Sequence, residues 1–197
     1  MSLTLQPVTE SDIPSLSELW YKSFSIPINL LMFPNTPGIR AWWNEANGHD
    51  LLHNPHRKYL KVVDPVPVPG AVVAYAKWDL DPQHSGARFP EWHAESHRET
   101  CDLVFTVLDE EKRTFFGERR FYYLDMLVVD PAYRGRGAAA MLIQWGCELA
   151  DQEGVPVYLD AHIDAAPMYR RFGFNDREDK VVTSEGAVSM IREPETK

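Results

Sequence analysis

The stretch "LDMLVVDPAYRGRGAAAMLIQWG", Leu124–Gly146, joins an apolar run to a helical pattern through a glycine-rich turn. Nearly every residue from Phe121 to Val129 is apolar, which is typical of a strand buried on both faces. Pro131 ends that strand. Apolar residues then recur at helical spacing, and this pattern favours a helix that ends at Gly154.

A second apolar strand, Val155–Leu159, follows this helix. The order strand, helix, strand indicates a βαβ unit in which the two strands run parallel. Upstream, Tyr59–Val63 and Ala71–Asp79 are separated by a proline-rich turn and predict an antiparallel hairpin. We therefore expect an α/β fold with a mixed sheet, formed by a single domain over residues 1–197.

The other segments are expected to surround this sheet. Their patterns predict a strand at Leu3–Pro7, a helix from Ile13 to Phe24, a helix around Ile39–Asn47, a helix over Arg98–Phe116, a short helix around Ala165–Arg171 and a strand near Ala187–Ile191. Residues 82–99 are polar and contain prolines, so they are interpreted as an exposed internal linker. One side of the Arg98–Phe116 helix is apolar, with Leu103, Val104, Val107, Leu108 and Phe115, and is expected to face inward.

Composition and charge exclude several classes of protein. A net charge of −9 argues against nucleic-acid binding and slightly favours a cationic substrate. The chain has no apolar run long enough to cross a membrane and no secretory pattern after Met1, so we expect a cytoplasmic protein. The two cysteines, Cys101 and Cys147, are too few for a disulfide framework and are expected to be buried thiols.

The segment "AYRGRGAAA", Ala132–Ala140, has the chemistry of a phosphate site. A helix that begins there presents free N–H groups, and glycine lets a ligand approach the backbone closely. Arg134 and Arg136 add guanidinium groups that pair well with phosphate oxygens. A nucleoside-triphosphate loop would need a lysine after its last glycine, and a dinucleotide fingerprint would need a third glycine, although Asp160 lies where its acidic residue could stand. A solvated turn is the alternative.

Two motifs in this chain resemble those of the GNAT superfamily of N-acetyltransferases. "PAYRGRGAA" is similar to the family's pyrophosphate loop, Arg/Gln-x-x-Gly-x-Gly/Ala, at Arg134, Gly137 and Ala139. "MYRRFGF", Met168–Phe174, is similar to a Leu-Tyr-x-x-x-Gly-Phe segment that follows in the family at this distance. "LDMLVV", "CELAD" and "SMIREP" particularly resemble a fungal group of small acetyltransferases.

The resemblance implies a mostly antiparallel sheet with a central, splayed parallel pair that binds acetyl-CoA and releases coenzyme A. The residues expected to bind this cofactor are Leu127, Val128 and Val129, the loop residues Arg134, Gly135, Arg136, Gly137, Ala138 and Ala139, and His162, where relatives place a serine or asparagine. Tyr169 matches the family's usual acid, which protonates the departing thiolate. No metal is required, and His49, His53 and His56 are not expected to form a metal site.

Asp125 is the candidate proton acceptor because it is the lone carboxylate in an apolar strand. Its pKa should be raised if desolvation dominates, which would suit a base. It could instead contact the substrate, pair with an arginine or cap a backbone group. Tyr123 lies two residues earlier on the same face, and Phe24 and Phe33 belong to a group of aromatic residues in the first helix and the loop after it. We expect these three to contact the substrate.

The combined expectation is an acetyl-CoA-dependent N-acetyltransferase that transfers the acetyl group directly to a primary amine of a small molecule in a ternary complex. The buried position expected for Cys147 argues against an acyl-cysteine intermediate, and direct transfer is the simpler mechanism. The alternatives are a protein lysine or N-terminal acetyltransferase and a non-catalytic acyl-CoA binding module. Neither nucleic acid nor membrane is an expected partner, and the chain is expected to be a monomer or a homodimer.

Overall fold

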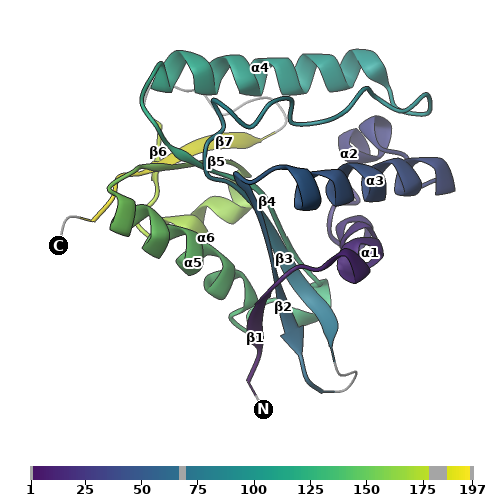
Figure 1. The fold of residues 1–197 in the computed structure, drawn as a ribbon, viewed down its shortest axis with the longest axis horizontal. Helices are drawn as coiled ribbons and strands as arrows, with labels where there is room; N and C mark the ends of the chain where they lie inside the picture. Colours follow the sequence, from purple (N-terminus) through teal and green to yellow (C-terminus); the bar gives the residue numbers. More distant parts are fainter. Residues whose placement is uncertain (1, 67–69, 178–185, 196–197) are drawn as a thin grey trace.

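A mixed sheet organises the structure (Figure 1). The computed structural model describes residues 2–66, 70–177 and 186–195. Within them the sheet has seven strands in the order β1-β2-β3-β4-β5-β7-β6, and only β4 and β5 pair in parallel. This confirms the mixed sheet and the parallel pair. The strands are β1 Thr4–Pro7, β2 Arg57–Asp64, β3 Ala71–Asp79, β4 Tyr122–Val129, β5 Val157–His162, β6 Asn175–Asp176 and β7 Ala187–Arg192.

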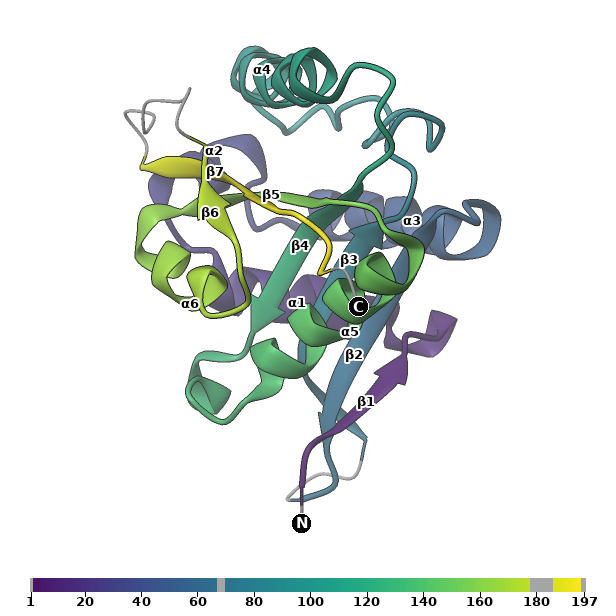
Figure 2. The ribbon, with the colours of Figure 1, turned by 90° about the vertical axis from the view of Figure 1, so that its left-hand side faces the viewer.

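Helices cover both faces of the sheet (Figure 2). α5 and α6 lie on one face, whereas α1, α2, α3 and α4 lie on the other. The helices are α1 Ile13–Ser23, α2 Pro27–Met32, α3 Pro37–His53, α4 Arg98–Phe116, α5 Ala138–Glu153 and α6 Ala166–Arg170, with single 3-10 turns at Glu10–Asp12, Pro131–Tyr133 and Ile163–Ala165. In the described part of the chain, no helix combines the length and apolarity needed to cross a bilayer.

Each face has its own apolar core. On the α5 face, Trp78, Tyr122 and Leu142 are fully buried in one cluster. On the opposite face, Leu16 and Ile39 are fully buried in a second cluster that includes many aromatic rings. Burying apolar area at roughly 25 cal/mol per Å² makes these two clusters the main stabilising contribution to the fold. The sheet is therefore held from both sides.

The parallel pairing of β4 and β5 is short. It consists of two residue pairs, Tyr122 with Val157 and Tyr123 with Tyr158. Beyond these pairs the strands separate. On its other edge β4 pairs with β3, and the register shifts so that Asp125 is an extra residue in β4, between the partners of Lys77 and Trp78. Bulges of this kind redirect side chains beside functional sites.

Residues 82–99 were expected to form an exposed linker, but the structure packs part of them against the sheet. Ser85 is buried, and the Arg88 side chain is only 14% exposed because it reaches down to β4. The Trp92 indole donates a hydrogen bond to Asp102 at 2.7 Å. The segment had no periodic pattern because its residues are buried one at a time, by contacts distant in sequence.

The bounds expected for α4 are confirmed, but its expected inward face is only partly correct. Leu103 is 67% exposed and Val107 is 42% exposed. The helix instead buries Cys101, Lys112 and Phe116. Its C-terminal end packs through Phe116 on a cluster with Phe121, Tyr123 and Tyr158, so α4 lies over the point where β4 and β5 are paired.

A glycine sets the distance between α5 and the sheet. A Cβ atom at Gly146 would overlap the buried ring of Trp78, whereas Gly48 in α3 faces open space. We expect Gly146→Ala to lower the free energy of unfolding by about 2 kcal/mol, since the clash outweighs the better helix propensity of alanine. Gly48→Ala is the control and should raise it by about 0.5 kcal/mol. Urea unfolding of both variants measures the difference, and equal effects would contradict this account.

Candidate active site

A pocket of about 680 Å³ opens where β4 and β5 have separated. Its walls come from the end of α1, the second half of β4, the loop into α5, and the segment from the end of β5 through α6. Of the residues expected to bind the cofactor, it brings together Leu127, Val128, Val129, Arg134, Gly135, Gly137, Ala138, Ala139 and His162. We name it the β4–α5 pocket.

The glycine-rich loop has the backbone that an anion site requires. Gly135 and Gly137 have φ angles of +74° and +89°, a region that side chains rarely adopt. A Cβ atom at either position would meet open space, so a ligand can approach the backbone there. Gly137 caps α5, a helix of 16 residues whose first N–H groups and dipole favour a phosphate. The loop therefore fits a pyrophosphate.

The two arginines of the loop have different surroundings. Arg134 lines the β4–α5 pocket. Arg136 instead donates to the Asp64 carboxylate at 3.1 Å, and its guanidinium lies 4.4 Å from the centre of the Tyr133 ring. Asp64, at the end of β2, has a lowered pKa, first because it accepts a backbone hydrogen bond from Val66 and also because of Arg136, although burial acts in the opposite direction. Arg136 thus fastens the loop to β2, whereas Arg134 is the loop arginine that lines the pocket, together with Arg171 from the end of α6.

Tyr169 reaches the β4–α5 pocket from α6. The residue is 7% exposed, and its ring packs edge-on against Phe174 at 5.8 Å. Burial raises the pKa of its phenol well above the usual value. Tyr169 therefore stays protonated at neutral pH and can donate a hydrogen bond into the pocket.

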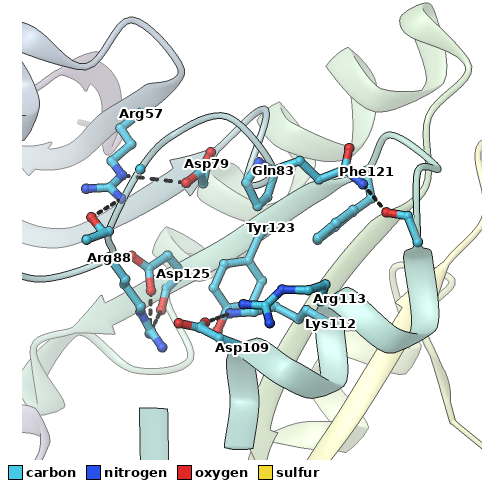
Figure 3. Close-up of a pocket in the computed structure, with 14 residues that line it drawn as sticks. Arg57, Asp79, Gln83, Arg88, Asp109, Lys112, Arg113, Phe121, Tyr123 and Asp125 are labelled. Atoms are coloured by element: carbon cyan, nitrogen blue, oxygen red, sulfur yellow. Dashed lines mark hydrogen bonds and ion pairs between the residues drawn. The ribbon is translucent and has the colours of Figure 1, made fainter. Parts of the chain in front are cut away.

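A second pocket, of about 360 Å³, lies between β4 and α4 (Figure 3). Its walls include Tyr123 and Asp125 from β4, Arg88 from the segment before α4, and Asp109 and Lys112 from α4. Lys112 lies 2.8 Å from the Asp109 carboxylate and 3.8 Å from the centre of the Tyr123 ring. We name it the β4–α4 pocket, and half of its lining residues are charged.

Asp125 is buried among cations. Its side chain is 5% exposed, forms an ion pair with Arg88 and lies 3.2 Å from the Lys77 ammonium group. Burial pushes its pKa upward, but Arg88, Lys77 and Lys112 together hold it well below the usual value. The condition for a raised pKa, dominant desolvation, is therefore not met. A carboxylate this firmly ionised is a weak base, and the alternative of an arginine pair describes its surroundings.

Asp160 on β5 is a carboxylate in a contrasting environment that the sequence did not single out for catalysis. The Tyr123 hydroxyl donates to it at 3.2 Å, and the Ser189 hydroxyl donates at 2.8 Å. Burial raises its pKa above the usual value, and Lys112, Ser189, Arg88 and Tyr123 offset this only in part. The signal was the tripeptide Tyr-Leu-Asp, which occurs in both β4 and β5. Its meaning depends on the register of the two strands.

The three residues expected to contact the substrate lie in three different places. Phe24 lines the β4–α5 pocket and Tyr123 the β4–α4 pocket. Phe33 is only 2% exposed and packs among the rings of Trp20, Trp42, Trp43, Phe89, Trp92 and Phe105. The expectation for Phe33 is corrected, since its apolar ring belongs to the core. Cys147 is buried as expected, and burial raises its pKa to about 11, which leaves it an inert thiol.

These features define a family of proteins that transfer acyl groups. A sequence model of the acetyltransferase (GNAT) family matches residues 14–174, and the chain belongs to this family. The match includes both the glycine-rich loop and the segment around Tyr169.

Individual relatives agree with this assignment. An uncharacterised N-acetyltransferase of Schizosaccharomyces pombe is 33% identical over 97 residues, which cover 46% of this chain and 39% of that protein. A Corynebacterium glutamicum structure described as histone acetyltransferase HPA2 and related acetyltransferase has a TM-score of 0.64 at 20% identity and covers 100% of this chain and 99% of its own. The PaiA N-acetyltransferase of Thermoplasma acidophilum, solved in complex with coenzyme A, has a TM-score of 0.59 at 12% identity and covers 98% and 99%.

The glycine-rich loop provides a test of cofactor binding. We expect Gly137→Asp to reduce the affinity for acetyl-CoA at least about 100-fold, because a carboxylate at this helix start fills the approach and repels phosphate. Gly154→Asp is a matched control, since Gly154 has a φ of +66° and open space at the other end of α5. Calorimetric titration measures both affinities. Wild-type affinity in Gly137→Asp would rule out the phosphate loop.

The ion pair between Arg88 and Asp125 provides a test of stability. Arg88→Met should lower the free energy of unfolding by about 2 kcal/mol at pH 7, because it removes one partner from a buried carboxylate that retains Lys77. Since the folded pKa of Asp125 is lowered, this contribution is present above its unfolded value near 4 and is lost as the pH falls through the folded one. Urea unfolding at pH 7 and at low pH measures the loss.

The surface pair Arg98 and Glu91 supplies the control for this stability test. Both side chains are well exposed, so Arg98→Met should change the free energy of unfolding by less than about 0.5 kcal/mol. In Arg88→Met combined with Asp125→Asn, most of the loss should be recovered, because the uncompensated charge is gone. Equal losses in Arg88→Met and Arg98→Met would contradict a buried ion pair.

Proposed function

We propose that the chain is an acetyl-CoA-dependent N-acetyltransferase that transfers the acetyl group directly to a primary amine of a small molecule in a ternary complex. One observation carries this proposal: a single strand, β4, lines both pockets, with Asp125 in the β4–α4 pocket and Leu127 in the β4–α5 pocket. The two reactants can therefore be held at once, on either side of the point where β4 leaves β5.

The β4–α5 pocket fits acetyl-CoA through this chain's own groups. Gly135, Gly137 and the first turn of α5 would hold the pyrophosphate, with Arg134 beside them. When bound, the thioester supplies an acetyl group activated for attack by an amine. Backbone groups of Leu127–Val129, on the edge of β4 beyond its pairing with β5, would hold the pantetheine arm and polarise the thioester oxygen. The Tyr169 hydroxyl would donate to the departing sulfur.

The β4–α4 pocket fits a small polar amine. Its volume of about 360 Å³ is in the range of small-ligand sites. Both carboxylates and cations line it, so an amine with further polar groups finds partners there, whereas a purely aromatic amine does not. A covering helix, α4, also favours a compact acceptor, because a peptide needs an open groove or a free strand edge. Acetylation of a protein amine is the alternative that the test includes.

The test combines binding with transfer. Calorimetric titration with acetyl-CoA should show saturable binding of one molecule per chain. Thiol release from acetyl-CoA should then accompany acetylation within a panel of spermidine, tryptamine, a zwitterionic amino sugar and a peptide with a free N-terminus. Transfer to the peptide alone would replace the small-molecule acceptor with a protein. Binding without transfer would indicate an acyl-CoA binding module.

Tyr169 gives the proposal a residue-level test. Tyr169→Phe should lower kcat by about 100-fold, because the departing sulfur loses its hydrogen-bond donor. The affinity for acetyl-CoA should change less than about twofold, since the ring still packs on Phe174. Tyr122→Phe, in the core of the α5 face, is a matched loss of a phenol and should leave kcat unchanged. Unchanged turnover in Tyr169→Phe would remove its role as a donor.

A further inference from the structure

We propose that Asp160, hydrogen-bonded to Tyr123 and Ser189 where β4 and β5 separate, is the group that accepts the proton of the acceptor amine, while Asp125 remains a permanent anion beside it. This inference rests on the proposed transferase function and names the proton acceptor of that site. It replaces Asp125 in the role that the sequence had suggested.

The first observation is the repeated tripeptide. Tyr-Leu-Asp occupies 123–125 in β4 and 158–160 in β5, and the two tyrosines are a residue pair in the parallel register. Each aspartate follows its tyrosine by two residues, so in a regular strand it would lie on the same face. Both aspartates therefore stand just past the last pair of the parallel ladder, where the strands begin to leave each other.

The second observation is a hydrogen-bonded chain across three strands. Tyr123 on β4 and Ser189 on β7 donate to opposite oxygens of Asp160 on β5, and β5 is the strand between β4 and β7. The carboxylate is thus held in one orientation from both sides. Both donors are neutral hydroxyls, so neither neutralises its charge, and each can turn to accept a hydrogen bond when the carboxylate takes a proton.

The third observation is the contrast between the two carboxylates. Asp125 is in direct contact with the cationic groups of Arg88 and Lys77, whereas Asp160 directly contacts hydroxyl groups. The charged and titratable groups around Asp160 are Lys112 from α4, Arg88 from the segment before it, Tyr123 from β4 and Tyr158 from β5. Their combined effect leaves the pKa of Asp160 raised and that of Asp125 lowered. Two carboxylates with separated pKa values are the usual sign of divided roles at one site.

Asp160 also lies between the two pockets along β5. Tyr158, two residues before it, packs under α4 with Phe116 and Tyr123. His162, two residues after it, lines the β4–α5 pocket. Asp160 is half-buried and lines neither pocket itself, but Tyr123, which donates to it, lines the β4–α4 pocket. An amine in the β4–α4 pocket would therefore reach this carboxylate through the Tyr123 hydroxyl.

The proton balance of the step follows from these positions. The ammonium group of the acceptor gives one proton to Asp160, through the Tyr123 hydroxyl, which passes its own proton to the carboxylate and takes that of the amine. The neutral nitrogen then forms the C–N bond to the acetyl carbon as the C–S bond breaks. The thiolate takes the proton of Tyr169, and the second proton of the nitrogen returns to Tyr169 through solvent. Asp160 finally releases its proton to solvent, so one proton is lost per turnover.

The kinetic test compares pH profiles of variants. In the wild type, kcat at saturating acceptor should rise through an acidic limb and then level off. Asp160→Asn should lower kcat at pH 7 about 100-fold and abolish the level region, so that kcat keeps rising until the acceptor loses its own proton. Asp160→Glu should retain the acidic limb. Glu193→Gln, which removes an exposed carboxylate paired with Arg119, is the control and should match the wild type.

A second readout does not require turnover. Carbon-13 NMR titration of the aspartate carboxyls, assigned by Asp160→Asn, should place the pKa of Asp160 above the ordinary value near 4, and Tyr123→Phe should shift it further upward. An ordinary or lowered value overturns the proposal, as does an unchanged acidic limb in Asp160→Asn. If the wild type binds acetyl-CoA but acetylates no amine of the panel, the transferase function fails while this titration still decides the character of Asp160.

Discussion

The early separation of two parallel strands is the constraint on which the rest of the structure depends. After two residue pairs, β4 and β5 no longer satisfy each other's backbone groups. A buried strand edge without partners is costly, so the gap favours occupation by a ligand that can pair with it. The cores on the two faces hold the strands apart, because α5 packs on one side and α1 and α4 on the other.

Charge is distributed unevenly around that gap. The segment between β3 and β4 contributes Arg88 and α4 contributes Lys112, so two cations reach β4 from outside the sheet, whereas Lys77 comes from the neighbouring strand β3. They stabilise the ionised form of Asp125, whose neighbourhood would otherwise favour a neutral carboxyl. One strand further along, the groups in direct contact with Asp160 are hydroxyls, and Lys112 and Arg88 act on it only from a distance. The same tripeptide, Tyr-Leu-Asp, therefore has an aspartate with a lowered pKa in β4 and one with a raised pKa in β5, because the neighbouring side chains differ.

The sequence predicted what local patterns can encode. The apolar strand Phe121–Val129, the helix after the glycines and the bounds of α4 all follow from periodicity and caps. The glycine-rich loop was predictable for the same reason, since glycines at a helix start have a direct physical meaning. The partners of Asp125 were not, because Arg88 comes from a segment without periodicity. The significance of Asp160 required the register of β4 and β5, and the burial of Phe33 required the packing of distant rings.

The wall of the β4–α4 pocket that faces the sheet is formed by one continuous segment of the chain. Residues from Leu80 to Phe121 leave the sheet at the end of β3 and return at the start of β4, whereas the glycine-rich loop belongs to a different part of the sequence. Under the proposed function, acceptor choice can therefore change through replacement or lengthening of this segment without disturbing the glycine-rich loop. A replacement segment must supply a cation to Asp125 in place of Arg88. Without that cation, the buried carboxylate on β4 would have a single ion partner, Lys77. The need to pair the Asp125 charge thus limits which segments can connect β3 to β4 in this fold.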